Sequence, residues 1–166
     1  TANKNTVIAN VPIQPVNVNT RKPPTTQSTQ PPSPQNVNTA ASPTTDESQA
    51  QKEISQRLIS WKTSAESLDL DGNISHYSGI VDYYNKISSS VAFVRADKLK
   101  AFSRYDSINI KLTNISISVD SAGQEASVTM DKEWDFQGSK NSSGKVKQFM
   151  KLNKVNGQWL ITTEKD

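Results

Sequence analysis

The sequence predicts an α+β domain in which a long amphipathic helix precedes an antiparallel sheet of four to five strands. Apolar residues recur at steps of three and four between residues 48 and 69, and apolar and polar residues alternate over most of the last sixty residues. The dipeptide Asn156-Gly157 separates two of these alternating runs. The three patterns are typical, in turn, of a helix packed on one side, of half-buried strands and of a tight hairpin.

Residues 1–45 predict a disordered linker. They hold all eight prolines and none of the Phe, Trp or Tyr residues, and most of the rest is Thr, Asn, Gln, Ser and Val. Such a segment buries too little apolar surface to offset its ordering entropy. We therefore divide the chain into a Pro/Thr/Asn/Gln-rich linker over 1–45 and one folded domain over 46–166. Because the chain begins at Thr1, we expect a fragment or processed product, with any membrane anchor upstream.

The charge balance gives no support for nucleic-acid binding. The linker carries three basic residues and no acidic one, so the domain holds 16 of each sign. A nucleic-acid-binding domain carries a dense basic patch on its own surface. The chain has no cysteine and one histidine, and no run approaches the roughly 18 apolar residues of a membrane span. We expect no metal and no cofactor, since scattered carboxylates alone make a poor metal site.

Helices and one short strand are expected before the sheet. The first helix spans about 48–69 and is ended by Asp71-Gly72, whereas Asn73 can cap a short second helix over about 73–78. A strand-like run follows over 80–85, and a third helix over about 90–105 is capped within Ser88 to Ser90. The stripe that the first helix should bury is Ala50, Ile54, Leu58, Trp61, Ala65 and Leu68.

Four consecutive strands should build the sheet, over about 107–119, 124–137, 144–155 and 158–164. In the first strand the alternation changes phase at Thr113-Asn114, which predicts a bulge that bends it. In the second strand the apolar face is interrupted by Lys132. We interpret the opposite face as a solvated one, because exposed sheet faces are usually charged. It carries Ser127, Thr129, Asp131, Glu133 and Asp135.

The Asn156-Gly157 turn fixes the register of the last hairpin. Both residues tolerate the positive φ that a two-residue type I′ turn requires. The register then pairs Val155 with Gln158, Lys154 with Trp159 and Leu152 with Ile161. We expect a buried face of Met150, Leu152, Trp159 and Ile161, and a mixed face of Phe149, Lys151, Leu160, Thr162 and Glu164.

The order of elements resembles the cone-shaped fold of the nuclear transport factor 2-like superfamily, which includes ketosteroid isomerase and SnoaL-type proteins. The resemblance covers about residues 50–165. It is closest to versions appended to bacterial cell-envelope proteins, such as receptor-like serine/threonine kinases. It implies a bent sheet wrapped over the long helix, a conical pocket and frequent dimers through the sheet face. Its local marks include Trp61-x-x-x-Ala65, Asp82-Tyr83-Tyr84, Phe93-Val94-Arg95-x-Asp97-Lys98 and Gly157-x-Trp159-x-Ile161-x-x-Glu164.

The sequence supplies no recognisable catalytic set. Ketosteroid isomerase-like catalysis uses a carboxylate base with a tyrosine and a neutral acid, and the stripe of the first helix contains no tyrosine. We interpret His76 as a packing or surface residue, because a catalytic imidazole needs an orienting partner. We therefore assign no catalytic residue, although an enzyme remains an alternative.

A ligand pocket is the other candidate feature. Aromatic residues can wall such a pocket for a small apolar or peptidic ligand, and Lys98 on the third helix can meet an anionic ligand or water. Core and rim packing is the competing interpretation of the same residues. The candidate pocket residues are Tyr83, Tyr84, Lys98, Tyr105, Asp131 and Trp134.

Three functional hypotheses follow. The first is a non-catalytic, extracytoplasmic bacterial domain on a flexible stalk that senses a ligand or binds a partner. The second is a SnoaL-like isomerase, dehydratase or hydrolase with a small hydrophobic substrate, which requires a buried carboxylate within hydrogen-bonding reach of a Tyr or His beside an enclosed pocket. The third is a structural dimerisation domain, a homodimer through the sheet face, which predicts a dimer in light scattering and no ligand-dependent rise in melting temperature.

Overall fold

The computed structural model describes residues 45–166, which form three helices and one six-stranded sheet. The predicted linker lies outside the described residues, apart from Thr45, at which the first helix begins. In chain order the elements are α1 (Thr45–Glu66), α2 (Leu70–Ile74), β1 (Tyr77–Tyr83), β2 (Lys86–Ser90), α3 (Val91–Phe102), β3 (Tyr105–Val119), β4 (Glu125–Gly138), β5 (Ser142–Val155) and β6 (Gln158–Lys165).

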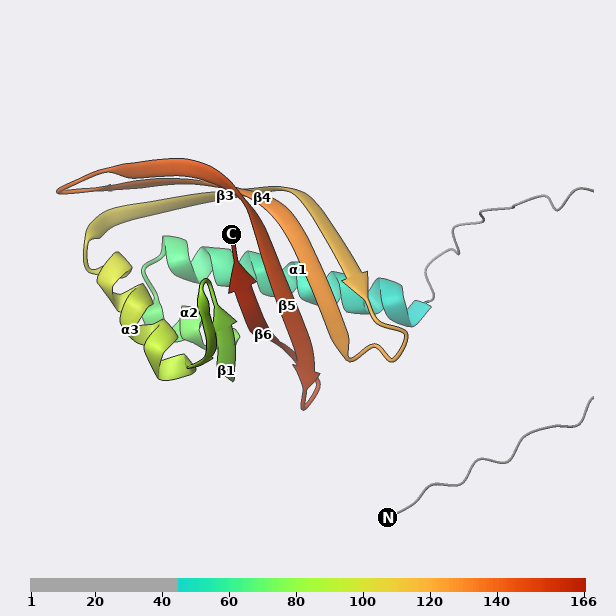
Figure 1. The fold of residues 1–166 in the computed structure, drawn as a ribbon. Coiled ribbons are helices and arrows are strands. Elements are labelled where there is room, and N and C mark those ends of the chain that lie inside the picture. The colour runs from blue at the N-terminus through green and yellow to red at the C-terminus, as the bar shows by residue number, and fades with distance from the viewer. Residues whose placement is uncertain (1–44) are drawn as a thin grey trace, which may run out of the picture. The chain divides into compact units, whose positions relative to one another are not determined.

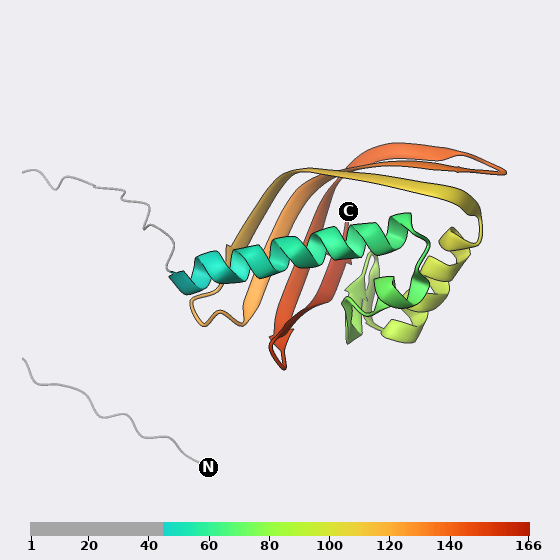
Figure 2. The same ribbon diagram turned by 180° about the vertical axis from the view of Figure 1, so that it is seen from behind.

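The sheet bends around the long helix. Its strand order is β2-β1-β6-β5-β4-β3, with β1 parallel to β6 and every other pair antiparallel. The long strands β3, β4 and β5 arch over α1, which crosses the concave side of the sheet (Figures 1 and 2). Helices α2 and α3 lie at one end of that concave side (Figure 2). The predicted α+β class and the wrapped sheet are confirmed.

Helix α1 fills the inside of the arch. The predicted stripe is buried from Ala50 to Ala65, with Ile54 and Leu58 almost inaccessible, and it packs on the concave face of the sheet. Leu68, the last residue of that stripe, is half-buried and lies beyond the end of the helix. A polar residue beside this stripe, Glu53, also bonds to the sheet. Glu53 accepts hydrogen bonds from Lys154 Nζ at 2.9 Å and from Trp159 Nε1 at 3.1 Å. Apolar burial therefore sets the position of the helix, and these polar contacts hold its side.

The predicted hairpin and bulge are both confirmed. Val155 pairs with Gln158 and Leu152 with Ile161, and Asn156 and Gly157 have φ values of 50° and 78°. Between Thr113 and Ser116 the pairing of β3 with β4 shifts, and Asn114 has a φ of 51°. This irregularity bends the edge of the sheet over the helix.

The segment between the first helix and the sheet differs from the prediction. Helix α1 ends at Glu66, and Leu68 adopts a φ of 57°. Asp69 then caps α2 by accepting the Gly72 N–H at 2.9 Å, so Asp71-Gly72 lies inside a helix and ends none. Asn73 does not cap a helix. It is buried in α2, and its amide donates to the Trp61 carbonyl at 2.9 Å.

The remaining differences are small. Strand β2 has no counterpart in the prediction, because its five residues are mostly exposed and show no apolar alternation. Helix α3 begins where expected, with Ser90 accepting the Phe93 N–H as the N-cap. Among residues 45–166, no helix is long and apolar enough to cross a membrane.

Candidate ligand-binding site

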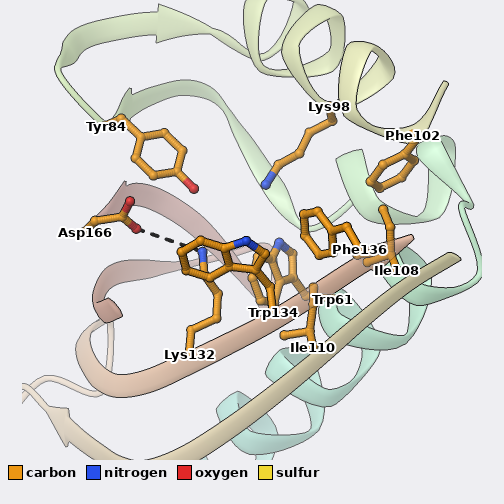
Figure 3. A pocket seen from close by; sticks show the side chains of 11 residues that line it. Trp61, Tyr84, Lys98, Phe102, Ile108, Ile110, Lys132, Trp134, Phe136 and Asp166 are labelled. Carbon is orange, nitrogen blue, oxygen red and sulfur yellow. Dashed lines mark ion pairs between the residues drawn. The ribbon is translucent and has the colours of Figure 1, made fainter. Parts of the chain in front are cut away.

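A cavity of about 260 Å³ lies at the end of the arch where α3 meets the sheet. Its walls come from the C-terminal half of α1, from α3, and from the paired strands β3 and β4 (Figure 3). Most of the lining is apolar, and four polar side chains face it together. The apolar lining residues are Trp61, Ala65, Phe102, Ile108, Ile110, Trp134 and Phe136, and the polar ones are Tyr84, Lys98, Lys132 and Asp166.

Strand β4 supplies the central part of the cavity wall. Lys132 and Trp134 are two residues apart and therefore point to the same side of the sheet. Trp134 lies over Gly144, its partner on β5, where even a Cβ atom would come within 2.4 Å of the indole ring. The Trp134 Nε1–H donates to Ser142 Oγ at 3.2 Å. The glycine thus gives the indole the space to lie flat along the wall.

Lys132 brings a largely buried amino group to the cavity. Only 13% of its side chain is exposed, and its nearest carboxylate oxygen is Asp166 Oδ1 at 3.9 Å, which is beyond hydrogen-bond distance (Figure 3). Among residues 45–166, no protein group accepts a hydrogen bond from this nitrogen. Burial lowers the pKa of Lys132, and the nearby Lys98 adds to that effect, while the charges of Glu164 and Asp166 oppose it.

Lys98 approaches the cavity from α3. Its Nζ lies 3.4 Å from both carboxylate oxygens of Glu164 and 5.4 Å from the centre of the Trp61 ring. The rings of Tyr77 and Tyr83 are both 5.6 Å away. An ammonium group among ring faces gains from cation–π attraction, so the position of Lys98 is fixed by several contacts.

Glu164 is the buried centre of the polar cluster. It is inaccessible to solvent and accepts hydrogen bonds from Tyr77 Oη at 2.5 Å, Tyr84 Oη at 3.0 Å and Gln148 Nε2 at 2.9 Å. Trp61 Nε1 in turn donates to Tyr77 Oη at 2.8 Å. A chain of hydrogen bonds therefore runs from α1 through β1 to the last strand.

The charges of the cluster follow from these contacts. Burial raises the pKa of Glu164, but the Lys98 and Lys132 ammonium groups and the two tyrosine hydroxyls outweigh it and hold the pKa below its ordinary value. Burial and the Glu164 charge raise the pKa values of Tyr77 and Tyr84, so both phenols stay protonated. Glu164 is thus an ionised carboxylate with every neighbour donating to it, and it does not line the cavity.

The structure brings three of the six predicted pocket residues to the cavity: Tyr84, Lys98 and Trp134. Tyr83 is buried beside it, with its ring edge-on to Tyr84 and its hydroxyl donating to Asp97 at 3.0 Å. Tyr105 packs on the ring of Phe136 at the start of β3.

Asp131 lies on the opposite side of the sheet from the cavity, which corrects our placement of it in the pocket. It neighbours Lys132 in the strand, and successive side chains alternate between faces. It accepts hydrogen bonds from Lys147 Nζ at 2.8 Å and from Asn114 Nδ2 at 2.7 Å, and both lower its pKa. The outer face of β4 carries a second charge pair, Glu133 with Lys145 at 2.8 Å.

Sequence reasoning missed Lys132, Glu164 and Asp166. Glu164 was expected on the mixed outer face of the last hairpin. A register shift leaves Thr162 unpaired, so Glu164 pairs with Met150 and turns inward. The spacing already held a signal, because Ile161 and Glu164 are three residues apart where a regular strand repeats every two. Lys132 gave a signal as well, since it interrupts an otherwise apolar face.

His76 is buried and packs against α1, as the prediction of a packing residue allowed. Its Nδ1 lies 3.2 Å from Arg57 Nη1, and neither Asp71 nor Asp82 is its partner. Burial and the Arg57 charge lower the pKa of His76 to about 4. Among residues 45–166, no three His, Cys, Asp or Glu side chains gather in a way that could hold a metal ion.

Comparison with solved structures identifies the fold. A proposed dehydratase of the NTF2-like family from Streptomyces avermitilis superposes with a TM-score of 0.62 at 15% identity, over 69% of this chain and 91% of that chain. A proposed scytalone dehydratase from Novosphingobium aromaticivorans gives 0.64 at 12% identity, over 72% and 84%. An NTF2-like protein of unknown function from Pseudomonas putida gives 0.62 at 16% identity, over 71% and 85%.

The domain therefore has the nuclear transport factor 2-like fold. No protein-family model and no curated protein sequence matches the chain. At these identities the likeness extends to the fold, and one fold hosts enzymes and non-enzymes alike.

Proposed function

We propose that this domain is a non-catalytic module that binds a small ligand with an apolar body and an anionic or hydrogen-bond-accepting end. The buried amino group of Lys132 carries the proposal. It faces the cavity with no acceptor in contact among residues 45–166. A buried ammonium without an acceptor is costly, and a ligand oxygen would relieve that cost.

The neighbours of Lys132 support the same ligand chemistry. Lys98 and Tyr84 approach the cavity from two other elements (Figure 3). Glu164 fixes the position of both residues. Its backbone carbonyl accepts the Tyr84 N–H at 2.7 Å, and its carboxylate accepts hydrogen bonds from the Tyr84 and Lys98 side chains. Pre-positioned donors bind an acceptor with less ordering cost than mobile ones. The remaining walls suit a flat or branched apolar body of modest size.

The position of Glu164 favours binding over catalysis. The structure does contain a buried carboxylate hydrogen-bonded to tyrosines, which the enzyme hypothesis requires. However, Glu164 is ionised, surrounded by donors and behind the cavity lining. A general base must reach the proton that it abstracts. Glu164 instead holds the donors in place.

The setting of the module is inferred from sequence alone. We propose that it belongs to the extracytoplasmic side of a bacterial cell envelope, where the 1–45 segment would space it from an upstream anchor or from an appended partner such as a receptor-like kinase. A homodimer through the sheet face is part of the same proposal. Cell fractionation of the full-length protein tests the proposed location, and recovery in the cytosol would contradict it. Light scattering at micromolar concentration measures the molecular mass, and the mass of a monomer would contradict the proposed homodimer.

We expect 2-naphthoate to bind the full chain more tightly than 2-naphthalenemethanol, which has the same ring system and no charge. Quenching of tryptophan fluorescence measures the affinity for each compound, because Trp61 and Trp134 line the cavity. Replacing Lys132 by methionine should weaken 2-naphthoate binding about tenfold to a hundredfold, since a hydrogen bond to a charged group contributes roughly 1.5–3 kcal/mol.

Lys145→Met is the matched control for this titration, because Lys145 lies on the outer face of the sheet. It should leave the affinity unchanged. Equal affinities for the two naphthalenes, or an equal loss in both variants, would remove the basis of the proposal.

A SnoaL-like enzyme is the second candidate, and one observation favours it. Asp166 is a carboxylate that does line the cavity, and two of the similar structures are described as proposed dehydratases. An enzyme of this kind would remove a proton next to a carbonyl group. Exchange of the α-protons of 2-tetralone in D₂O, followed by NMR, measures that activity. We expect the α-protons to exchange at the same rate with the protein as in buffer alone. A protein-dependent rate that disappears in Asp166→Asn would establish the enzyme instead.

A further inference from the structure

A ligand oxygen is one way to reduce the energetic cost of the buried Lys132 charge. Loss of the proton from its amino group is another. The amine lies among the aromatic and aliphatic walls of the cavity, and within the described residues 45–166 its only carboxylate neighbour within 4 Å is Asp166. Lys98 adds a positive charge on the same cavity, whereas the charges of Glu164 and Asp166 favour the protonated amine, and burial outweighs them. An apolar pocket and a neighbouring cation are the two conditions that convert lysine into a nucleophile at neutral pH.

We propose that Lys132 is a reactive amine that forms an imine with small aromatic aldehydes bound in the cavity. The inference rests on the proposed binding function and narrows its ligand class to carbonyl compounds. The carbonyl oxygen would be the acceptor, facing Lys98, and the carbonyl carbon would face the Lys132 nitrogen. The apolar body would occupy the walls formed by Trp61, Trp134 and Phe136.

The chemistry balances with groups that the cavity holds. The lone pair of the unprotonated Lys132 Nζ forms a bond to the carbonyl carbon, and the π electrons of the C=O bond move to the oxygen. That oxygen takes up protons and leaves as water when the nitrogen forms the C=N bond. Asp166, 3.9 Å from Nζ, is placed to exchange the protons that the nitrogen releases and the oxygen accepts. The product is an imine and one water molecule, with no change of oxidation state.

Selective labelling tests the inference. The full chain is incubated at pH 7 with 2-naphthaldehyde and sodium cyanoborohydride, which delivers hydride to the imine carbon and leaves a stable secondary amine. Peptide mapping by mass spectrometry then gives the rate at each lysine. An ordinary lysine is unprotonated in only about one molecule in 2,500 at this pH, and each unit by which its pKa falls raises that fraction tenfold.

We expect Lys132 to be labelled at least about tenfold faster than the exposed Lys111 and Lys145, whose side chains are 65% and 58% accessible. Excess 2-naphthoate should slow labelling at Lys132 and leave the exposed lysines unaffected. Lys132→Arg keeps the positive charge and removes the reactive amine, so it should abolish the fast site, with circular dichroism verifying its fold.

Labelling of Lys132 at or below the rate of the exposed lysines would overturn the inference. The titration with 2-naphthoate separates that failure from a failure of the binding proposal. If 2-naphthoate binds and Lys132 stays unlabelled, the cavity binds ligands without reacting with them. If neither occurs, both the binding function and the reactive amine are wrong.

Discussion

Replacing Glu164 by glutamine should lower the free energy of unfolding at pH 7 by about 3–5 kcal/mol, which is the usual effect of removing one partner from a buried ion pair. The carboxylate is inaccessible and accepts hydrogen bonds from Tyr77, Tyr84 and Gln148 while facing Lys98. A glutamine amide has the same size but turns one acceptor into a donor. The buried ammonium groups then lose their counter-charge, and at least one donor loses its partner.

Urea unfolding followed by tryptophan fluorescence measures the change, and Glu133→Gln provides the control. Glu133 pairs with Lys145 at the surface, with 36% of its side chain exposed, so its replacement should change the free energy of unfolding far less than that of Glu164. Glu164 has a lowered pKa in the folded state, so its contribution is present above about pH 4.5 and declines as the pH falls below that value. A Glu164→Gln variant as stable as the wild type at pH 7 would contradict the anchoring role.

The second large effect is a loss of stability in mild acid that arises from His76. Its pKa is lowered from 6.5 to about 4 in the folded protein, by burial and by the Arg57 charge. Between these two values the unfolded chain binds a proton that the folded domain excludes. The contribution of His76 is therefore complete above about pH 6.5, and about 3 kcal/mol of stability should be lost as the pH falls from 6.5 to 4.

Urea unfolding at a series of pH values from 7.5 to about 4 measures this loss. A His76→Gln variant, which cannot take up a proton, should be less stable at pH 7 but should show a much shallower pH dependence over the same window. The difference between the two curves isolates His76 from Glu164, which responds below about pH 4.5. Parallel curves for the two proteins would show that His76 titrates normally in the folded state.

Much of the fold could be predicted because local chemistry and burial agree. The Asn156-Gly157 turn set the hairpin register, and the phase change at Thr113-Asn114 marked the bulge that bends β3. The helix stripe around Trp61 was visible from spacing alone. The short segment that contains Asp69 and Asn73 was misplaced, because one side chain can cap a helix or be buried in it and only tertiary packing decides between them.

The site was predicted only in part, for two physical reasons. Alternation assigns side chains to faces, but it fails wherever an extra residue changes the phase, as Thr162 does before Glu164. The cavity also combines residues from six segments of the chain, and no local pattern brings Lys98, Lys132 and Asp166 together. Polar residues on apolar faces were the informative exceptions. Lys132 interrupts the apolar face of its strand in the sequence, and in the structure its side chain faces the cavity.

A crystal structure of the full chain grown with 2-naphthoate would show directly whether the cone holds a ligand. We predict the naphthalene ring between Trp61 and Trp134, with its carboxylate within hydrogen-bond distance of the Lys132 and Lys98 amino groups. A cone that stays empty at saturating concentrations, or a ligand whose carboxylate points away from both lysines, would contradict the account.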